Sequence, residues 1–140
     1  MNYIESETVE LKAEVVSDIC KEIIAFANTK GGTLYIGVQD DGQIIGVNDA
    51  DRVMLQISNM VRDSIKPDVT MFVGYKTQEE NGRQVVAVTV QKGTDRPYYL
   101  GSKGLKPSGV YVRNDTSTDP ATDTAIRKRI KEPAGDTFEA

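Results

Sequence analysis

Apolar and polar residues alternate near the start of the chain. Val9 and Leu11 lie between polar neighbours, which predicts a strand over residues 7–13 with one buried face. Glu10 and Lys12 then share the other face of this strand. Apolar residues at helical spacing follow, and they predict an amphipathic helix that ends near residue 28. Its apolar stripe is Ile19, Ile23, Phe26 and Ala27, with Ser17 as the expected N-cap and Gly31 and Gly32 as the expected end.

Turn signals divide the rest of the chain. Asp41-Gly42 and Asn81-Gly82 each separate two apolar runs, which predicts two β-hairpins. A second helix begins near Asp49 and cannot continue past Pro67, and a last helix opens at Asp119-Pro120. The remaining strands are expected over residues 33–38, 43–47, 69–76, 83–91, 98–100 and 110–113. Hairpins require antiparallel pairing, so the predicted class is α+β, with a mixed, largely antiparallel sheet and about three helices.

The composition is that of a soluble globular protein. Of 140 residues, 39% are hydrophobic and 27% are charged, and no apolar run approaches the length of a membrane span. The N-terminus shows no secretory signal, so a cytoplasmic location without membrane contact is expected. One domain over residues 1–131 is predicted, and the polar tail 132–140 is interpreted as the start of a linker to a further region.

Charge is distributed unevenly within a net charge of −4. Residues 1–91 hold 8 basic and 14 acidic side chains, whereas residues 92–131 hold 9 basic and 4 acidic ones. These portions could form two faces of one site, with carboxylates for a metal ion and cations for phosphates. They could equally be ordinary solvated surface.

The chain contains no histidine and a single cysteine, Cys20. This excludes an internal disulfide, the usual zinc sites and any histidine-dependent catalysis. Any chemistry must therefore use carboxylates, lysine, tyrosine or a metal ion held by oxygen. Cys20 itself lies among apolar helix residues and is expected to be a small buried hydrophobe.

Several consecutive motifs resemble one known family. The longest is Ala25-Phe26-Ala27-Asn28-Thr29-Lys30-Gly31-Gly32, which leads into the Ile36-Gly37-Val38 run. Together with the flanking motifs it resembles the Schlafen/AlbA_2 domain family over roughly residues 3–131. The flanking motifs are Glu5-Ser6, Val9-Glu10-Leu11-Lys12, Asp40-Asp41-Gly42, Ile45-Gly46-Val47, Arg96-Pro97-Tyr98-Tyr99-Leu100, Val110-Tyr111-Val112-Arg113 and Ala121-Thr122.

The resemblance implies a Schlafen/AlbA_2-like fold that handles nucleic acid or a nucleotide. Bacterial members are described as DNA-binding or transcriptional-regulator domains, and the region has also been described as a divergent ATP-binding module. Eukaryotic Schlafen relatives cleave transfer and ribosomal RNA with three carboxylates. By motif position these correspond to Glu5, Glu10 and Asp40. The leading expectation is a nucleic-acid-binding module of a transcriptional regulator, with a metal-dependent endoribonuclease and an ATP-binding domain as alternatives.

The three acids are chemically suited to a metal-dependent nuclease. Mg²⁺ and Mn²⁺ prefer carboxylate oxygens, and a metal-bound water can attack a phosphodiester. Glu10 and Asp40 could converge if the strand over 7–13 neighbours the strand over 33–38, and Lys12 would then lie near a bound phosphate. The ordinary alternative is that Glu5 is an exposed terminal residue and that Asp40 only shapes a turn.

ATP has weaker support in the sequence. Gly31 and Gly32 follow a helix instead of preceding one, and the Walker spacing is absent, so their expected role is helix termination and close packing. Asn28 could present its amide to a ligand at the helix end, or serve the structure alone.

Basic and aromatic residues of the C-terminal part are the candidates for nucleic-acid contact, through phosphate neutralisation and base stacking. They are Lys103, Lys106, Arg113, Arg127, Lys128, Tyr98 and Tyr99. The sequence distinguishes neither DNA from RNA nor a monomer from a homodimer.

Overall fold

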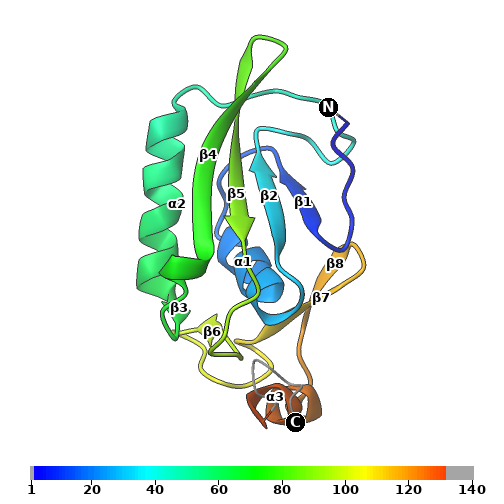
Figure 1. Cartoon of the computed structure of the whole chain (residues 1–140), viewed down its shortest axis with the longest axis vertical. Coiled ribbons are helices and arrows are strands. Elements are labelled where there is room, and N and C mark those ends of the chain that lie inside the picture. The colour runs from blue at the N-terminus through cyan, green and yellow to red at the C-terminus, as the bar shows by residue number, and fades with distance from the viewer. Residues whose placement is uncertain (1, 132–140) are drawn as a thin grey trace.

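The computed structural model describes residues 2–131, with side chains as far as residue 128 (Figure 1). The predicted tail 132–140 lies outside the described residues. In chain order the elements are β1 (Val9–Lys12), α1 (Ile19–Asn28), β2 (Gly32–Ile36), α2 (Ala50–Ser64), β3 (Ile65–Lys66), the short 3-10 helix η1 (Thr70–Phe72), β4 (Val73–Glu80), β5 (Arg83–Val90), β6 (Tyr99–Leu100), β7 (Tyr111–Asn114), β8 (Ser117–Pro120) and α3 (Asp123–Lys131).

The main sheet has four strands in the order β1-β2-β5-β4. β1 and β2 are parallel, with Glu10 opposite Leu34, whereas β2, β5 and β4 pair in antiparallel fashion. Two small antiparallel sheets, β3-β6 and β7-β8, complete the pairing. The fold is therefore α+β with a mixed, largely antiparallel sheet, as the sequence predicts.

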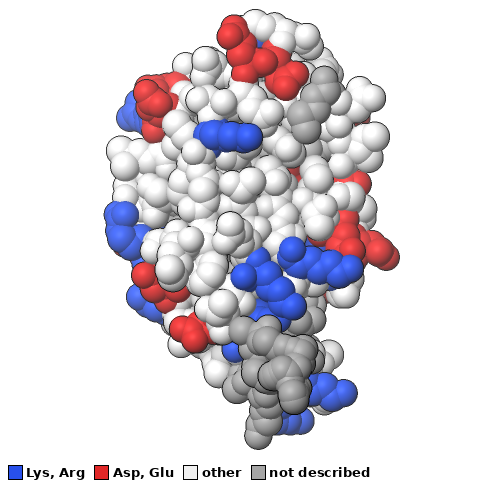
Figure 2. Space-filling model, in the orientation of Figure 1, with Lys and Arg blue, Asp and Glu red and all other residues white. Residues whose placement is uncertain are grey.

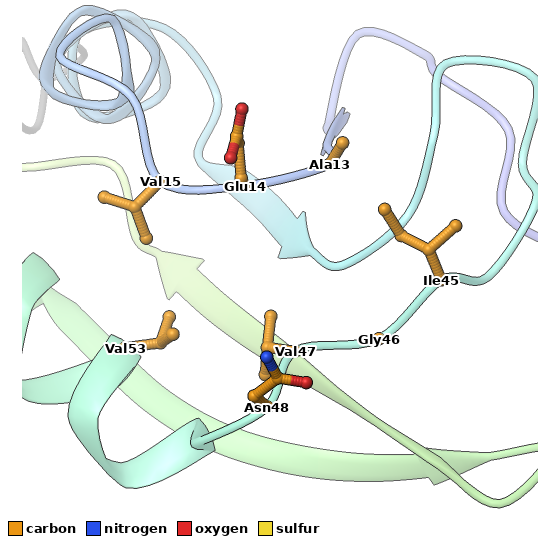
Figure 3. A pocket seen from close by; sticks show the side chains of 8 residues that line it. All are labelled: Ala13, Glu14, Val15, Ile45, Gly46, Val47, Asn48 and Val53. Carbon is orange, nitrogen blue, oxygen red and sulfur yellow. The ribbon is translucent and has the colours of Figure 1, made fainter.

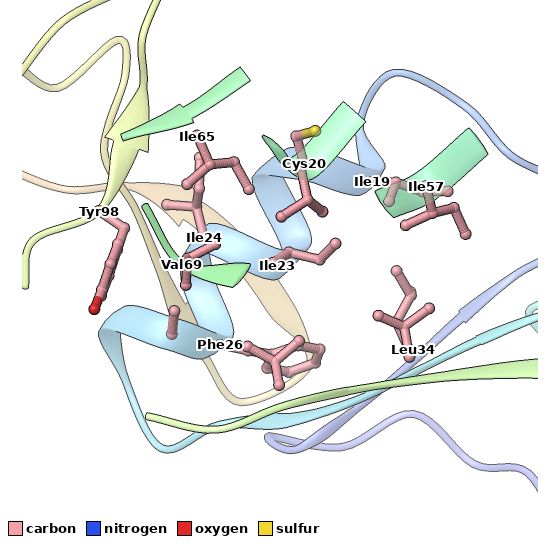
Figure 4. Packing of buried hydrophobic residues seen from close by; sticks show 14 of the residues in the cluster. Ile19, Cys20, Ile23, Ile24, Phe26, Leu34, Ile57, Ile65, Val69 and Tyr98 are labelled. Carbon is pink, nitrogen blue, oxygen red and sulfur yellow. The ribbon is translucent and has the colours of Figure 1, made fainter. Parts of the chain in front are cut away.

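The main core lies between one face of this sheet and the helices α1 and α2. Figure 4 shows Ile23 and Phe26 of α1 in one cluster with Leu34 of β2 and Ile57 of α2. All four are fully buried, and Cys20 is buried in the same cluster, as predicted. A smaller core around Leu11 and Tyr3 covers the opposite face. Within residues 2–131, no helix is long and apolar enough to cross a membrane.

The predicted strand over residues 43–47 is wrong. This segment makes only two isolated bridges, Val38 to Ile44 and Val47 to Gln84. The backbone amides of Ile45 and Gly46 both donate to the carbonyl oxygen of Gly37, at 2.9 and 2.8 Å. The segment therefore crosses the end of the sheet and does not extend the hairpin.

The boundaries of two helices also differ from the prediction. Asp119 and Pro120 belong to strand β8, which the sequence analysis did not predict, and α3 begins only at Asp123. There the hydroxyl of Thr122 accepts a hydrogen bond from the amide of Ala125 at 3.0 Å. At the start of α1 the N-cap is Asp18, one residue later than the predicted Ser17.

The close packing at the C-terminal end of α1 can be tested by comparing two glycines with the same backbone conformation. Gly31 has φ +78°, and a Cβ there would lie 2.6 Å from the carbonyl oxygen of Val90, whereas Gly82 has φ +74° and open space around it. Gly82→Ala should cost about 1 kcal/mol for the left-handed conformation alone. Gly31→Ala should cost about 2–4 kcal/mol, because a steric clash is added. Urea unfolding of both variants measures the difference, and equal losses would show that the close approach at Gly31 is unimportant.

Candidate functional site

Three charged side chains from distant parts of the chain meet in the interior. Glu10 of β1 is 7% exposed, Glu22 of α1 is 8% exposed and Arg113 of β7 is 3% exposed. The alternation of β1 turns Leu11 to one face of the sheet and Glu10 and Lys12 to the face that carries α1. We call Glu10, Glu22, Arg113 and Lys12 the ionic centre.

Arg113 makes most of the contacts in the ionic centre. Its Nη1 atom lies 2.6 Å from Glu10 Oε1 and 3.5 Å from Glu22 Oε1, and it donates to the hydroxyl of Thr118 at 3.1 Å. Its Nη2 atom donates to the carbonyl oxygens of Ser6 and Val9, at 2.8 and 3.0 Å. The guanidinium thus joins the N-terminal segment, α1 and the β7-β8 hairpin.

Lys12 supplies the second cation. Its Nζ atom lies 3.1 Å from Glu22 Oε2 and 3.9 Å from Glu10 Oε2. Burial is the largest single effect and lowers the pKa of Lys12. The charge and hydrogen bond of Glu22, together with the charges of Glu10 and Asp18, outweigh burial, and the pKa is raised above its usual value. Glu22 also accepts a hydrogen bond from the hydroxyl of Thr118 at 2.5 Å. Each carboxylate of the centre therefore faces both cations.

Glu10 holds a proton more tightly than an ordinary carboxylic acid. Its pKa is raised from 4.5 to about 7, most of all by burial and next by the nearby charge of Glu22. The hydrogen bond from Arg113 opposes these effects, whereas a hydrogen bond between the carboxyl groups of Glu10 and Glu5 adds to them.

The structure brings together two of the three predicted metal ligands. Glu5 reaches Glu10, and its Oε2 atom also lies 3.4 Å from the amide of Leu11. Asp40 does not join them and is exposed beside Ala13, Gln39 and Asp41. Over residues 2–131, no three His, Cys, Asp or Glu side chains are placed to hold a metal ion. The arrangement therefore does not fit Mg²⁺ or Mn²⁺, because Arg113 and Lys12 already contact the buried carboxylates.

The predicted nucleotide-binding residues lie at the end of α1. The Asn28 amide donates to the carbonyl oxygens of Tyr98 and Tyr111 and accepts from the amide of Tyr98, all within 3.0 Å. A Cβ on Gly32 would lie 2.6 Å from the ring of Phe26. The backbone at Gly31 and Gly32 is therefore closely packed, and the Asn28 amide fixes the later segments against α1.

The structure buries the side chains of two of the predicted nucleic-acid contacts. Tyr98 is 0% exposed and Arg113 is held inside the ionic centre, so neither can reach a nucleic acid at the surface. Tyr99 is half-buried against the small core of the C-terminal part. Exposed members of the predicted set are Lys103, Lys106, Arg127 and Lys128.

These four cations lie at one end of the molecule, and we call them the basic end. Lys103 and Lys106 belong to the loop 101–109, and Arg127 and Lys128 belong to α3. Figure 1 shows the loop and α3 together at the lower end, and Figure 2 shows basic side chains near that end. A small core formed by Val110, Val112, Ala121 and Ile126, with Tyr99 packed against it, holds α3 beside the loop.

A separate hollow of about 460 Å³ lies between residues 13–15 and residues 45–48 (Figure 3). Val15, Val47 and Val53 give it an apolar lining, and Glu14 lies at its margin. None of the residues predicted for catalysis or binding lines this hollow.

Sequence reasoning missed Glu22 and Thr118. Glu22 follows Ile19 by three residues and precedes Phe26 by four, so it falls on the apolar stripe of α1. A charged residue on a buried stripe needs a partner, which was a usable signal. Thr118 carried no such signal, because strand β8 was not predicted.

The comparisons with known proteins agree with this architecture. A model of the family described as "Schlafen, AlbA_2" matches residues 5–122, which is most of the chain. The chain belongs to the Schlafen AlbA_2 family. Among curated proteins, none matches the sequence significantly.

Two solved structures resemble this Schlafen AlbA_2 domain. The N-terminal domain of a Nitrosomonas europaea protein, described as related to the ATP-dependent DNA helicase RecG, has 25% identity and a TM-score of 0.60, with coverage of 81% of this chain and 82% of that one. The DIP2311 protein of Corynebacterium diphtheriae has 21% identity and a TM-score of 0.61, with coverage of 82% of this chain. The match spans only 22% of the DIP2311 chain, and at this identity it shows the fold alone.

The raised pKa of Glu10 predicts how stability depends on pH. Between pH 4.5 and about 7 the folded chain retains a proton at Glu10 that the unfolded chain loses, so this residue makes stability fall as pH rises through that window. Glu10→Gln should remove this contribution and flatten the dependence. Urea unfolding at a series of pH values measures it, with the exposed Glu79→Gln as the matched control. An unchanged slope in Glu10→Gln would contradict the assignment.

Proposed function

We propose that this Schlafen AlbA_2 domain is a nucleic-acid-binding module of a transcriptional regulator, and that it contacts phosphates through its basic end. The observation that carries the proposal is a small core that contains Val110 and Tyr99, which flank the exposed basic loop 101–109, together with Ile126 of the exposed basic helix α3. Phosphate contacts by lysine and arginine supply most of the non-specific affinity for nucleic acid.

Local charge makes such binding compatible with a net charge of −4. Most of the acidic excess lies in residues 1–91. Two of these acids, Glu10 and Glu22, are paired with cations inside the ionic centre. The loop and α3 come from the part of the chain in which basic residues outnumber acidic ones. Electrostatic attraction falls off within about 8 Å at physiological salt, so a phosphate at the basic end senses mainly nearby cations.

The family and one relative favour the same function. The Nitrosomonas europaea protein is described as related to an ATP-dependent DNA helicase, which associates this domain type with DNA. The metal-dependent endoribonuclease has less support, because Asp40 lies apart from Glu10 and the buried carboxylates face Arg113 and Lys12. The ATP-binding alternative has less support as well, because the Asn28 amide is engaged by backbone groups.

Fluorescence anisotropy with a labelled DNA duplex and an RNA of the same length tests the proposal. The wild-type affinity should fall steeply with salt, with a logarithmic slope of about −0.9 for each phosphate contact on duplex DNA. Changing Lys103, Lys106, Arg127 and Lys128 to Gln should weaken binding at low salt by about tenfold or more and make the slope shallower.

The matched control also changes four exposed cations to Gln, and all four lie outside the loop and α3. They are Lys30, Arg52, Arg62 and Lys76. This variant should bind as the wild type does. The proposal fails if the wild type does not bind either nucleic acid at low ionic strength, or if the control variant loses as much affinity as the basic-end variant.

A further inference from the structure

The groups around the Arg113 guanidinium are of the kind that bind a planar cation with several N–H donors. Five oxygen acceptors lie around its two terminal nitrogens, namely Glu10 Oε1, Glu22 Oε1, Thr118 Oγ1 and the carbonyl oxygens of Ser6 and Val9. The distances, 2.6 to 3.5 Å, lie mostly in the range of N–H···O hydrogen bonds. The ring of Phe26 has its centre 5.2 Å from the guanidinium carbon, and aromatic rings attract such cations.

A divalent metal ion would need a different arrangement. Mg²⁺ and Ca²⁺ bind oxygen atoms at about 2.0–2.6 Å and favour several carboxylates or waters around one point. Here the acceptors are divided between the Nη1 and Nη2 atoms of Arg113, and two of the five are backbone carbonyls. The charges are also balanced, because Glu10 and Glu22 face Arg113 and Lys12.

We infer that Glu10, one of the three acids for which the family resemblance implies a metal, belongs in this chain to a built-in guanidinium-binding site that Arg113 fills. The site selects a planar cation by the positions of its hydrogen-bond acceptors and by its contact with the Phe26 ring. Arg113 is consequently a positioning residue, which fixes the β7-β8 hairpin to β1 and α1. This inference does not depend on nucleic-acid binding.

Chemical complementation tests the inference. Arg113→Ala removes the group from Cγ onward, and ethylguanidinium restores those atoms as a free ion. Low-millimolar ethylguanidinium should raise the melting temperature of Arg113→Ala saturably, by about 5 °C at a tenfold excess over its Kd. The wild type, whose site is filled, should not respond. Ethylammonium and MgCl₂ at matched ionic strength should have no effect on the variant.

Two results of the melting experiment would overturn the inference. One is a folded Arg113→Ala variant that does not respond to ethylguanidinium. The other is a larger stabilisation by Mg²⁺ than by ethylguanidinium, in the variant or in the wild type, which would identify a metal site.

A measurement on the unaltered chain applies even if Arg113→Ala does not fold. Mn²⁺ broadens the NMR signals of nuclei near its binding site. In the wild type, the amide signals of Leu11 and Ile23, which follow Glu10 and Glu22 in the sequence, should stay sharp when Mn²⁺ is added. Selective broadening of these two signals would place a metal ion at the ionic centre and overturn the inference.

Discussion

The structure depends on one buried interaction, the contact of the Arg113 guanidinium with Glu10, Glu22 and the backbone near β1. Removing a charged side chain from water is costly, and a buried ion pair stabilises a fold only when its remaining donors and acceptors are satisfied. The two terminal nitrogens of Arg113 meet this condition with five oxygen acceptors, and Lys12 balances the second carboxylate. The buried Nε atom of Arg113 has no hydrogen-bond partner in the described part of the chain. Losing one member would leave an uncompensated charge in the interior, so the arrangement constrains the N-terminal segment, α1 and the C-terminal hairpin together.

This constraint connects the interior with the proposed binding surface. The β7-β8 hairpin is tied to the body by Arg113, by the Thr118 hydroxyl on Glu22 and by the Asn28 amide on Tyr111. The same hairpin contributes Val112 to the small core on which α3 packs through Ile126. Contacts with α1 and β1 therefore determine the position of the basic end. The acids of the ionic centre contact Arg113 and Lys12 and not the cations of the basic end.

Local patterns predicted most of the fold, because helices and hairpins are encoded by neighbouring residues. The helices α1 and α2, the hairpin at Asn81-Gly82 and the shared face of Glu10 and Lys12 are all confirmed. The candidate site was less predictable. Arg113 pairs with a glutamate 103 positions earlier, and no local pattern specifies such a distant partner. Glu22 lay on an apolar stripe and could have been recognised, whereas the positions of Tyr98 and Asp40 depend on how loops cross the sheet.

The exchange of the Arg113 guanidinium protons with water tests this account most directly. In ¹⁵N-labelled protein, a guanidinium that is buried and bonded as described exchanges slowly, and its NH₂ groups give separate NMR signals at neutral pH because their rotation is restricted. We expect this behaviour for Arg113 and rapid exchange for the exposed Arg127. Exchange at Arg113 as fast as at Arg127 would contradict it, because the ionic centre would then be open to solvent.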